Sequence, residues 1–306
     1  MNVSIIIVTK DRWELLEDVV EYLQRHRQYY KEIVVIDNAS KEDPPKSIKA
    51  KPNLNMVKLP SNVGVSEGRN IGAVNAKGDL LCFIDDDGYL DMSKIDEVKN
   101  KFEVSDKLGV VSFGIKDVSQ MQDPTEVDFE TDDQAVQFVQ SHTFQGGACL
   151  INKEAFVDAG MYPEDFHYGT EERDLSMRLI DRGYSIKKTE DIVLLHYNPS
   201  KAIADGIYNP SHYYRNTIRY YWRNYPLEYA VVETALKIPS AILRSLSSEN
   251  RRAYAHGLLT GLLLIPSTIV NDRDPVSRDS YKQQKRLKEA SLAERTVSLI
   301  RDTIQR

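Results

Sequence analysis

Three consecutive carboxylic acids, Asp85, Asp86 and Asp87, directly follow the apolar run of residues 80–84. An apolar run of this length predicts a buried strand, and Gly88 predicts the turn that ends it. Carboxylates this close raise one another's pKa unless positive charge lies between them. A bound Mg²⁺ or Mn²⁺ would supply that charge, because hard cations take oxygen ligands and commonly bridge to substrate phosphates. The alternative is a solvated acidic turn, since Asp and Gly are common turn residues.

The segments around this acidic cluster alternate between strand patterns and helix patterns. Apolar runs predict strands at residues 3–8, 33–36, 55–59 and 80–84, with helical periodicity or a glycine-bearing loop that runs into a helix between them. Such alternation implies right-handed crossovers and a mostly parallel sheet with helices on both faces. Ligands bind beyond the carboxyl ends of the strands in such sheets. Asp11, Asp37 and the acidic cluster should therefore converge on one crevice.

Composition limits the class of protein. The chain has 306 residues, of which 41% are hydrophobic and 28% charged, which is typical of a folded protein. A net charge of -6 argues against nucleic acid as the main partner, because phosphate-backbone binding needs a basic face. Cys82 and Cys149 lie in apolar runs, so we expect no disulfide and a reducing compartment. The first residues lack the pattern of a signal peptide, and their apolar run is too short to span a bilayer.

The second half continues the pattern and then changes. Residues 108–115, 148–152 and 185–196 predict strands, and a helix is predicted near Glu171 with Asp174 and Arg178 placed for an i,i+4 ion pair. The polar stretch 117–140 predicts a surface insertion or loop. From about Pro199 the chain becomes helical and rich in aromatic residues and arginines. We therefore expect a catalytic domain at 1–200 and a helical region at 201–306.

Six segments together carry a family resemblance. They are VSIIIVTKDR, IVVIDNAS, NVGVSEGRNIGA, GDLLCFIDDDG, QGGACLINKEAF and YGTEERDLSMRLIDRGY. In order and approximate spacing, this set resembles family 2 inverting glycosyltransferases, which have the nucleotide-sugar GT-A fold. The resemblance covers about residues 1–200. The later segment YYRNTIRYYWRNYP is similar to the region after the core in rhamnosyltransferase-like members that build cell-surface glycans.

The resemblance implies a donor site made of several strand ends and one loop. Thr9 to Arg12, with Asp37 and Asn38, match positions that hold the nucleobase and ribose. Gly64 and Arg69-Asn70 match a loop beside the nucleotide. Arg69 would fork onto the diphosphate, or else serve as a structural arginine paired with Glu67 or Asp79.

Other positions match the metal and sugar side of that site. Asp85 and Asp87 match the family's D-x-D element. The resemblance places Asp85 on the sugar or ribose and Asp87 on the metal, with Asp86 grouped among the nucleotide-sugar-binding residues. His196 matches a histidine that completes the metal site in some members, although a purely structural histidine is the alternative.

An inverting transfer needs a base for the acceptor hydroxyl. The family pattern resembles E-D-x-D, whereas this chain reads Glu171-Glu172-Arg173-Asp174, so Glu172 stands where Asp is commoner. The base is left open between Glu171 and Glu172. Two carboxylates at a helix start can also simply complement the helix dipole. Gln145, Gly146 and Gly147 are expected on the acceptor side, where glycine lets backbone approach a sugar.

The C-terminal third mixes aromatic, basic and apolar segments. This composition suits helices at a membrane surface, and the equal alternative is a helical appendage packed on the core. In the surface case the acceptor would be a polyprenyl- or dolichyl-phosphate-linked glycan, with the arginines of residues 215–223 facing its phosphates. The protein would then be cytoplasmic and peripheral on the cell membrane.

These patterns predict one leading function and two alternatives. The leading one is a metal-dependent inverting glycosyltransferase that moves a sugar from a UDP- or dTDP-sugar to a glycan or lipid-linked glycan hydroxyl. A nucleotidyltransferase would usually carry a glycine-rich phosphate loop after the first strand, and VTKDRWELL lacks one. A catalytically silent glycan-binding protein with the same fold is the third possibility.

Overall fold

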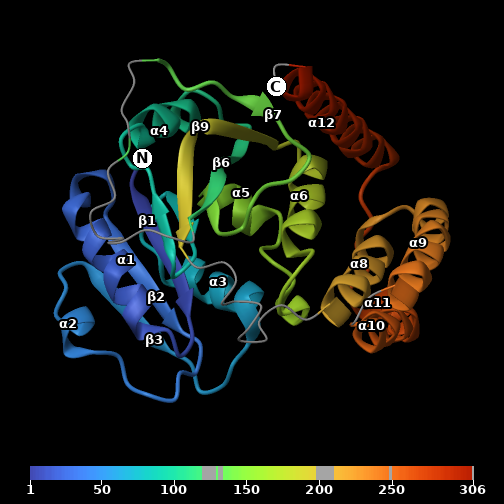
Figure 1. Cartoon of the computed structure of the whole chain (residues 1–306), viewed down its shortest axis with the longest axis horizontal. Coiled ribbons are helices and arrows are strands. Elements are labelled where there is room, and N and C mark those ends of the chain that lie inside the picture. The colour runs from blue at the N-terminus through green and yellow to red at the C-terminus, as the bar shows by residue number, and fades with distance from the viewer. Residues whose placement is uncertain (119–128, 130–133, 198–209, 248–249, 305–306) are drawn as a thin grey trace.

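The computed structural model describes residues 1–118, 129, 134–197, 210–247 and 250–304. The strands are β1 (Val3–Thr9), β2 (Glu32–Asp37), β3 (Leu54–Lys58), β4 (Leu80–Ile84), β5 (Gly88–Leu90), β6 (Leu108–Val118), β7 (Val139–Gln140), β8 (Ala148–Asn152) and β9 (Ser185–Tyr197). The helices are α1 (Trp13–Arg25), α2 (Lys46–Lys49), α3 (Gly64–Asn75), α4 (Ile95–Glu103), α5 (Lys153–Asp158), α6 (Glu171–Asp181), α8 (Pro210–Asn224), α9 (Leu227–Ser247), α10 (Arg251–Leu263), α11 (Ile265–Asn271) and α12 (Arg278–Ile304). Figure 1 shows the strands at the centre and α8–α12 on one side.

The first half of the sheet is parallel, as the sequence predicts. Strands β3, β2, β1 and β4 lie side by side in that order. Thr9 pairs with Asp37 at the carboxyl ends of β1 and β2, and Ile6 pairs with Phe83 of β4. β1, β2 and β4 therefore send the residues that follow them to the same edge of the sheet. The prediction of an α/β fold with a mostly parallel sheet flanked by helices is confirmed.

Antiparallel strands enter in the second half of the sheet. β8 pairs antiparallel with β4 and β6, β6 pairs parallel with β9, and β5 pairs antiparallel with β9. The predicted role of Gly88 is wrong in one respect, because Gly88 begins β5 and the turn lies just before it, closed by its N–H to the carbonyl of Asp85 at 3.0 Å. Gly88 is paired with His196 of β9. This pairing brings His196 next to the acidic cluster.

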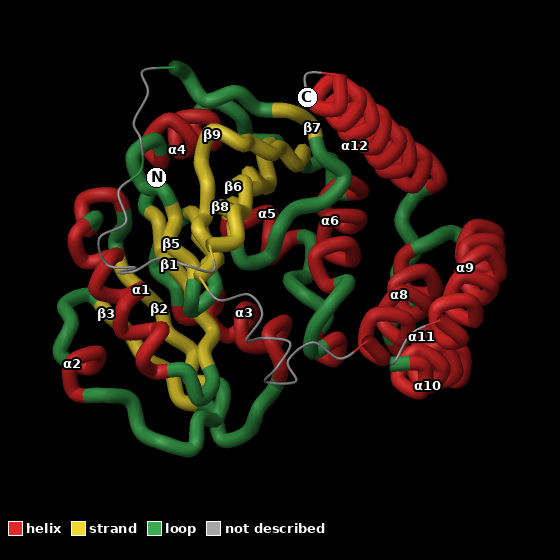
Figure 2. Tube along the Cα trace, viewed as in Figure 1, coloured by secondary structure: helices red, strands yellow, loops and turns green. Residues whose placement is uncertain are grey.

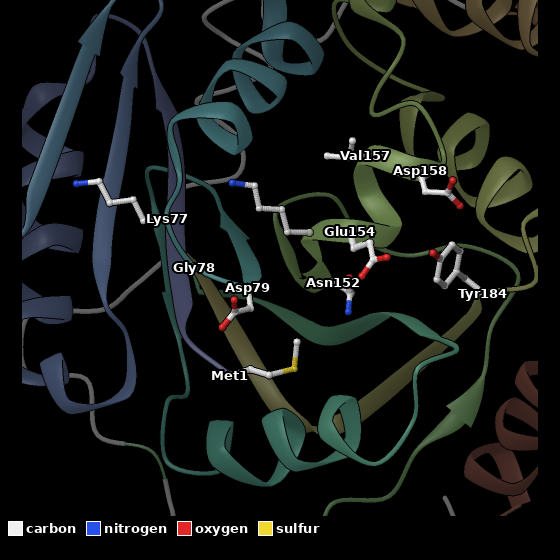
Figure 3. A pocket seen from close by; sticks show the side chains of 10 residues that line it. Met1, Lys77, Gly78, Asp79, Asn152, Glu154, Val157, Asp158 and Tyr184 are labelled. Atoms are coloured by element: carbon white, nitrogen blue, oxygen red, sulfur yellow. The ribbon is translucent and has the colours of Figure 1, made fainter.

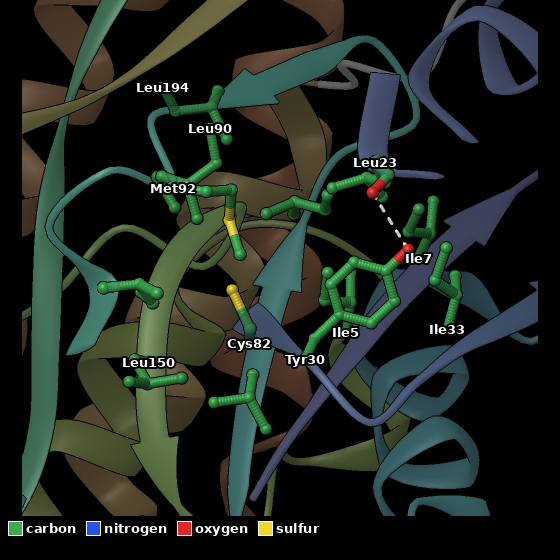
Figure 4. Packing of buried hydrophobic residues seen from close by; sticks show 14 of the residues in the cluster. Ile5, Ile7, Leu23, Tyr30, Ile33, Cys82, Leu90, Met92, Leu150 and Leu194 are labelled. Atoms are coloured by element: carbon green, nitrogen blue, oxygen red, sulfur yellow. Dashed lines mark hydrogen bonds between the residues drawn. The ribbon is translucent and has the colours of Figure 1, made fainter. Parts of the chain in front are cut away.

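Two apolar cores cover the two faces of the sheet. Alternate β1 residues point to opposite faces, so Ile5 and Ile7 belong to the core under α1 and α4, while Ile6 belongs to the core under α3, α5 and α6. In the first core the Tyr30 hydroxyl donates to the carbonyl of Leu23 at 3.0 Å (Figure 4). Cys82 and Cys149 are both buried and form no disulfide.

The C-terminal helices pack on the sheet domain through a third apolar cluster. On the side of the sheet domain, this cluster contains Phe166 and Met177. On the side of the C-terminal helices, it contains Tyr220 of α8, Tyr225 just after α8 and Tyr281 of α12. Figure 2 shows α8–α11 as one group of helices and α12 as a separate long helix that returns toward α6. Most of the predicted insertion at 117–140 and the predicted boundary near residue 200 lie outside the described residues.

The arginines of α8 differ from the expectation that they face acceptor phosphates. Arg219 pairs with Asp165 and, at 2.9 Å, with Asp272, and Arg223 lies 3.5 Å from the buried Asp174. Arg215 donates to backbone carbonyls of the sheet domain. Each of these arginines is therefore bound to carboxylates or carbonyls of the chain itself. The expectation that the arginines of α8 face acceptor phosphates is wrong.

Candidate active site

The acidic cluster lies at the carboxyl end of β4 and is compensated by arginine. Thr9 Oγ1 donates to Asp86 at 2.7 Å, and Arg12 Nη1 pairs with the same carboxylate at 2.7 Å while its Nη2 binds Asp87. Burial raises the pKa of Asp86 to about 7, even though Arg12 opposes the shift. The positive charge between these carboxylates therefore comes from the protein itself. We expected Thr9 and Arg12 at the nucleobase or ribose, and that role stays a prediction.

His196 contacts the last carboxylate of the cluster. Its Nε2 lies 3.0 Å from Asp87 Oδ1, and its Nδ1 lies 3.2 Å from Asp117 Oδ1. The hydrogen bond with Asp87 raises the pKa of His196 to about 9. Burial alone would raise the pKa of Asp87, but His196 and Arg12 outweigh burial and lower it. Asp117 is a contact that the sequence did not suggest, because it falls where a loop was predicted.

Asp87 and His196 fit a divalent cation as a pair of ligands. Within the described residues there is no group of three or more His, Cys, Asp or Glu side chains placed to hold a metal. In the part of the chain that the structure describes, the buried Asp87 Oδ1 has no partner besides His196 Nε2, 3.0 Å away. A cation there would replace the proton that these two groups share, because a histidine ligand must be neutral. Ions of this kind are often held by one or two protein groups together with substrate phosphates.

Arg69 of α3 joins the acidic cluster to the start of α6. Its Nη2 pairs with Asp85 at 3.1 Å, and its Nη1 lies 3.9 Å from a carboxylate oxygen of both Glu171 and Glu172. The guanidinium also lies over the ring of the buried Tyr162. The structural alternative of a pair with Glu67 or Asp79 is wrong, since the described carboxylates around Arg69 are those of the crevice.

The glycines before β8 are required by these side chains. A Cβ on Gly146 would overlap Arg69 Nη1 and Glu172 Oε1, and a Cβ on Gly147 would overlap the carboxylate of Asp85. The glycines thus let the charged groups approach backbone closely. Gln145 is exposed, and its N–H donates to Ser112 Oγ at 3.0 Å. Contact of these three residues with an acceptor stays a prediction.

The two glutamates differ in their access to solvent. The side chain of Glu171 is 2% exposed, whereas that of Glu172 is 24% exposed. Burial, together with the charge of Glu172, raises the pKa of Glu171. Burial also raises the pKa of Glu172, although Arg69 opposes the shift. Asp174 is fully buried against Arg178 at 2.7 Å, which confirms the predicted ion pair and removes it from the crevice.

Asp37 and Asn38 lie at the end of β2 with different hydrogen bonds. Asp37 is fully buried; its Oδ1 accepts from the Ser40 N–H at 2.8 Å, while its Oδ2 has no hydrogen-bond partner among the described residues. An unpaired buried carboxylate oxygen is suited to an incoming N–H or hydroxyl donor. The Asn38 side chain bridges to the backbone of Val63 and Gly64, so it holds the loop before α3. The predicted nucleotide contacts of both residues remain untested.

A separate hollow lies at the opposite edge of the sheet. It surrounds the amino ends of β1 and β4, and Figure 3 shows Met1, Asp79, Asn152 and Tyr184 among its lining side chains. None of the predicted site residues lines it. Because ligands of open α/β sheets bind beyond the carboxyl ends of the strands, we place the active site at the acidic cluster.

Tyr162 and Tyr168 are site residues that the sequence did not suggest. Tyr162 is buried under Arg69, and its hydroxyl has no partner among the described groups. Tyr168 is 38% exposed near Asp85 and the two glutamates, and burial raises its pKa to about 12. Both lie before α6, in a stretch whose sequence has neither a helix nor a strand period. The sequence therefore gives no sign that their side chains lie near the acidic cluster and the two glutamates.

Comparison with known families identifies the chain. The family model described as Glycosyl transferase family 2 matches residues 4–160, which contain the acidic cluster, Arg69 and the two glycines. The chain belongs to this family. Among curated relatives, it is similar to an uncharacterized glycosyltransferase, YwdF, of Bacillus subtilis (strain 168), with 28% identity over 107 residues, 35% of this chain and 40% of the relative. An uncharacterized glycosyltransferase of Haemophilus influenzae is 26% identical over 136 residues, 42% of this chain and 46% of that protein. This family 2 chain therefore spans less than half the length of these curated relatives.

Solved structures share the fold of this family 2 glycosyltransferase. The S. aureus TarS 1-349 structure in complex with UDP-GlcNAc has a TM-score of 0.56 and 17% identity, over 72% of this chain and 65% of that one. The mannosyltransferase PcManGT from Pyrobaculum calidifontis, in complex with GDP-Man and Mn2+, has a TM-score of 0.53 and 16% identity, over 89% and 88%. Identities this low show the fold alone, and they agree with the GT-A architecture expected from the sequence.

Proposed function

We propose that this chain is an inverting glycosyltransferase that moves a sugar from a UDP- or dTDP-sugar to a hydroxyl of a glycan or lipid-linked glycan. One observation carries the proposal: Arg69 joins Asp85 of the acidic cluster to Glu171 and Glu172. Arg69 thereby places a carboxylate pair, one member of which could act as the base for a hydroxyl, beside the carboxylate that the resemblance assigns to the sugar. Membership of a glycosyltransferase family supports this reading over a nucleotidyltransferase.

The donor would lie along the carboxyl ends of β1, β2 and β4. The unpaired Oδ2 of Asp37 would accept from the imide of a uracil or thymine, or from a ribose hydroxyl. Asp85 is the most exposed carboxylate of the cluster, at 41% of its side chain, and would bind a sugar hydroxyl. Solved relatives of the fold bind UDP-GlcNAc or GDP-Man, which supports a nucleotide-sugar donor of this general class.

The transfer step would use Glu172 as its base. The acceptor oxygen attacks the anomeric carbon from the face opposite the leaving group, and Glu172 takes the hydroxyl proton as the new bond forms. The bond between the anomeric carbon and the diphosphate oxygen breaks, and the nucleoside diphosphate leaves. Burial raises the pKa of Glu172, which makes it a stronger base than a free carboxylate. Arg69, beside the same carboxylate, holds it in place.

Asp87 and His196 would hold a divalent cation, Mn²⁺ or Mg²⁺. When bound, the cation supplies positive charge to the departing diphosphate. Arg12 adjoins the same carboxylate and keeps Asp87 ionised. The Mn2+ in the PcManGT structure supports a cation in proteins of this fold.

A nucleotide-binding experiment tests this assignment. We expect UDP or dTDP to raise the melting temperature with Mn²⁺ but much less in EDTA, because Asp87 and the diphosphate would share the ion. A ligand at about 100 times its Kd should add roughly 2.7 kcal/mol of stability. Asp87→Asn should remove the difference between Mn²⁺ and EDTA, whereas Asp43→Asn, at an exposed position, should keep it.

Two outcomes would contradict parts of this proposal. Equal stabilisation by UDP in Mn²⁺ and in EDTA would remove the metal from Asp87 and His196. Stabilisation without any release of nucleoside diphosphate from a range of nucleotide sugars and acceptors would favour the silent glycan-binding protein. Release of the diphosphate with transfer to an acceptor supports the enzyme.

We also infer that the acceptor is lipid-linked and that the C-terminal helices meet a membrane surface. No single described helix is long and apolar enough to cross a bilayer, while α10 and α11 reach that length and composition only as a pair bent by 46°. Exposed apolar side chains support contact with the headgroup–acyl boundary instead, among them Val232, Leu236, Leu246, Leu259 and Leu263.

A further inference from the structure

The turn that leads into α6 has an unusual backbone. We call residues 166–170 the presenting turn, because Glu171 follows it directly. His167 has φ 56° and ψ -57°, and the N–H of Tyr168 donates across it to the carbonyl of Phe166 at 2.6 Å. This is a γ-turn with positive φ, a rare and strained conformation. Gly169 and Thr170 also have positive φ, at 85° and 81°. Such backbone persists only where its surroundings enforce it.

One side chain of α8 gathers the carbonyls of this turn. Asn216 is fully buried, and its Nδ2 lies within hydrogen-bond distance of the carbonyl oxygens of Phe166 at 2.8 Å, Tyr168 at 3.1 Å and Gly169 at 2.8 Å, which share its two hydrogens. Its Oδ1 accepts from Arg215 Nε at 2.9 Å. Both ends of the amide are therefore used, which fixes its orientation.

Neighbouring contacts hold the presenting turn from both sides. Arg215 Nη2 donates to the carbonyl of Phe166 at 3.2 Å. On the opposite side, the N–H of Val65 in α3 donates to the carbonyl of His167 at 2.8 Å. The turn is thus clamped between α8 and the first residues of α3, the helix that carries Arg69. Any shift of Asn216 changes where α6 begins relative to Arg69.

We propose that Asn216 is a positioning residue, which fixes the presenting turn so that Glu171 and Glu172 meet Arg69 in the crevice. The inference rests on the proposed function and extends it to a helix outside the segment 4–160 that the family model matches. Asn216 touches neither glutamate; it acts through the backbone of the turn. The C-terminal region therefore forms part of the catalytic scaffold.

The clamp also sets the surroundings of the two glutamates. The two glutamates face each other. They also face five further ionisable groups: Arg69, Asp85, Tyr162, Tyr168 and Cys149. Burial is the largest cause of the raised pKa of both glutamates. A loosened turn admits water and reduces that burial. The pKa of the pair should then fall, and the acid limb of the pH–rate profile should move to lower pH.

Two buried asparagines of α8 make a matched comparison. Asn216→Leu keeps the side-chain volume and removes the donor that the three carbonyls of the turn share. Asn224→Leu is the control, because Asn224 is equally buried and donates instead to Asp174 Oδ2 at 2.6 Å and the carbonyl of Tyr220 at 3.2 Å. We expect both variants to lose melting temperature. Only Asn216→Leu should lower kcat, by about tenfold to a hundredfold, with donor Kd unchanged and the acid limb at lower pH.

The proposal is overturned if Asn224→Leu lowers kcat as much as Asn216→Leu, or if kcat and the pH profile of Asn216→Leu match those of the wild type. If Asn216→Leu does not fold, Arg215→Met removes the guanidinium that donates to the Phe166 carbonyl and to Asn216 Oδ1, and we expect the same pattern at smaller size. A wild-type level of kcat in that variant would then count against the clamp.

Failure of the proposed function can be recognised separately. If the wild-type chain transfers no sugar, amide hydrogen exchange still tests the clamp. Asn216→Leu should speed exchange at the amides from Tyr168 to Asp174 by about tenfold more than Asn224→Leu does. Equal exchange in the two variants overturns the positioning role, whatever the activity of the chain.

Discussion

At the scale of single residues, the glutamate pair gives the sharpest prediction. Glu172 is the partly exposed member and lies beside Gly146, while Glu171 is almost fully buried. We expect Glu172→Gln to lower the transfer rate by a factor on the order of 10² or more, because the amide cannot take a proton. Donor affinity should stay nearly constant, since a base acts only in the transition state. Transfer rate and nucleotide-sugar affinity are the two measurements.

The matched variants separate the base from its neighbour. Glu171→Gln should be much milder, and Glu154→Gln, in the first turn of α5, should have no effect. A near-normal rate for Glu172→Gln together with a large loss for Glu171→Gln would move the base to Glu171. Near-normal rates for both would exclude the start of α6 from the chemistry.

The buried Glu171 also links stability to pH. Burial raises its pKa above the ordinary 4.5 in the folded state. The folded chain therefore holds this proton at pH values where the unfolded chain has lost it, so stability falls as pH rises from about 4.5 through the folded-state pKa. Each unit of raised pKa corresponds to about 1.4 kcal/mol.

Glu171→Gln should remove this loss of stability because the amide does not ionise. We expect its melting temperature, relative to the wild type, to increase as pH rises from about 5 to 8. Glu154→Gln, at an exposed position, should keep the wild-type dependence. A constant difference between Glu171→Gln and the wild type over this range would show that the Glu171 carboxyl has an ordinary pKa.

At the scale of elements, the sequence predicts strands and helices far better than it predicts contacts between distant residues. The strands β1, β2 and β4 and the helix from Glu171 follow from apolar runs and periodicity, which depend on near neighbours. Their carboxyl ends do meet at one edge, because parallel pairing fixes the register of Thr9 with Asp37. The role of Gly88 was wrong because β9, its partner strand, lies about a hundred residues further along the chain.

The sequence also does not predict which side chains of distant elements contact one another. Arg12 lies on Asp86 and Asp87, 74 and 75 residues away, a contact that the sequence does not indicate, while its place beside the nucleotide stays a prediction. The arginines of α8 suggested phosphate contacts by composition, and carbonyls or carboxylates of the sheet domain occupy them instead. Asn216 gave no signal at all, since a single Asn in an aromatic helix has no motif. Such assignments need the tertiary fold.

At the scale of the whole molecule, the C-terminal helices have one face on the active site and another toward solvent. Tyr220 and Tyr281 pack with Met177 of α6, and Asn216 holds the presenting turn. On the outer side of α9, Val232, Leu236 and Leu246 lie within about 80° of arc at 100° per residue. These three side chains are 52%, 68% and 77% exposed. If the outer face meets a membrane as proposed, the two faces together would place a surface-bound acceptor within reach of the crevice.

Vesicle binding tests this orientation. A helix with an exposed apolar stripe buries it at the headgroup boundary, and each buried leucine contributes about 1.5–3 kcal/mol. We expect the chain to sediment with vesicles of mixed zwitterionic and anionic phospholipid, and Leu236→Glu with Leu246→Glu to reduce the bound fraction at least tenfold. Val74→Glu with Val104→Glu is the matched control, because those side chains are 69% and 80% exposed but lie in the sheet domain. An equal loss in both double variants would show that the stripe has no special part in binding. A wild-type chain that stays in the supernatant would show that the acceptor reaches the crevice without a membrane surface.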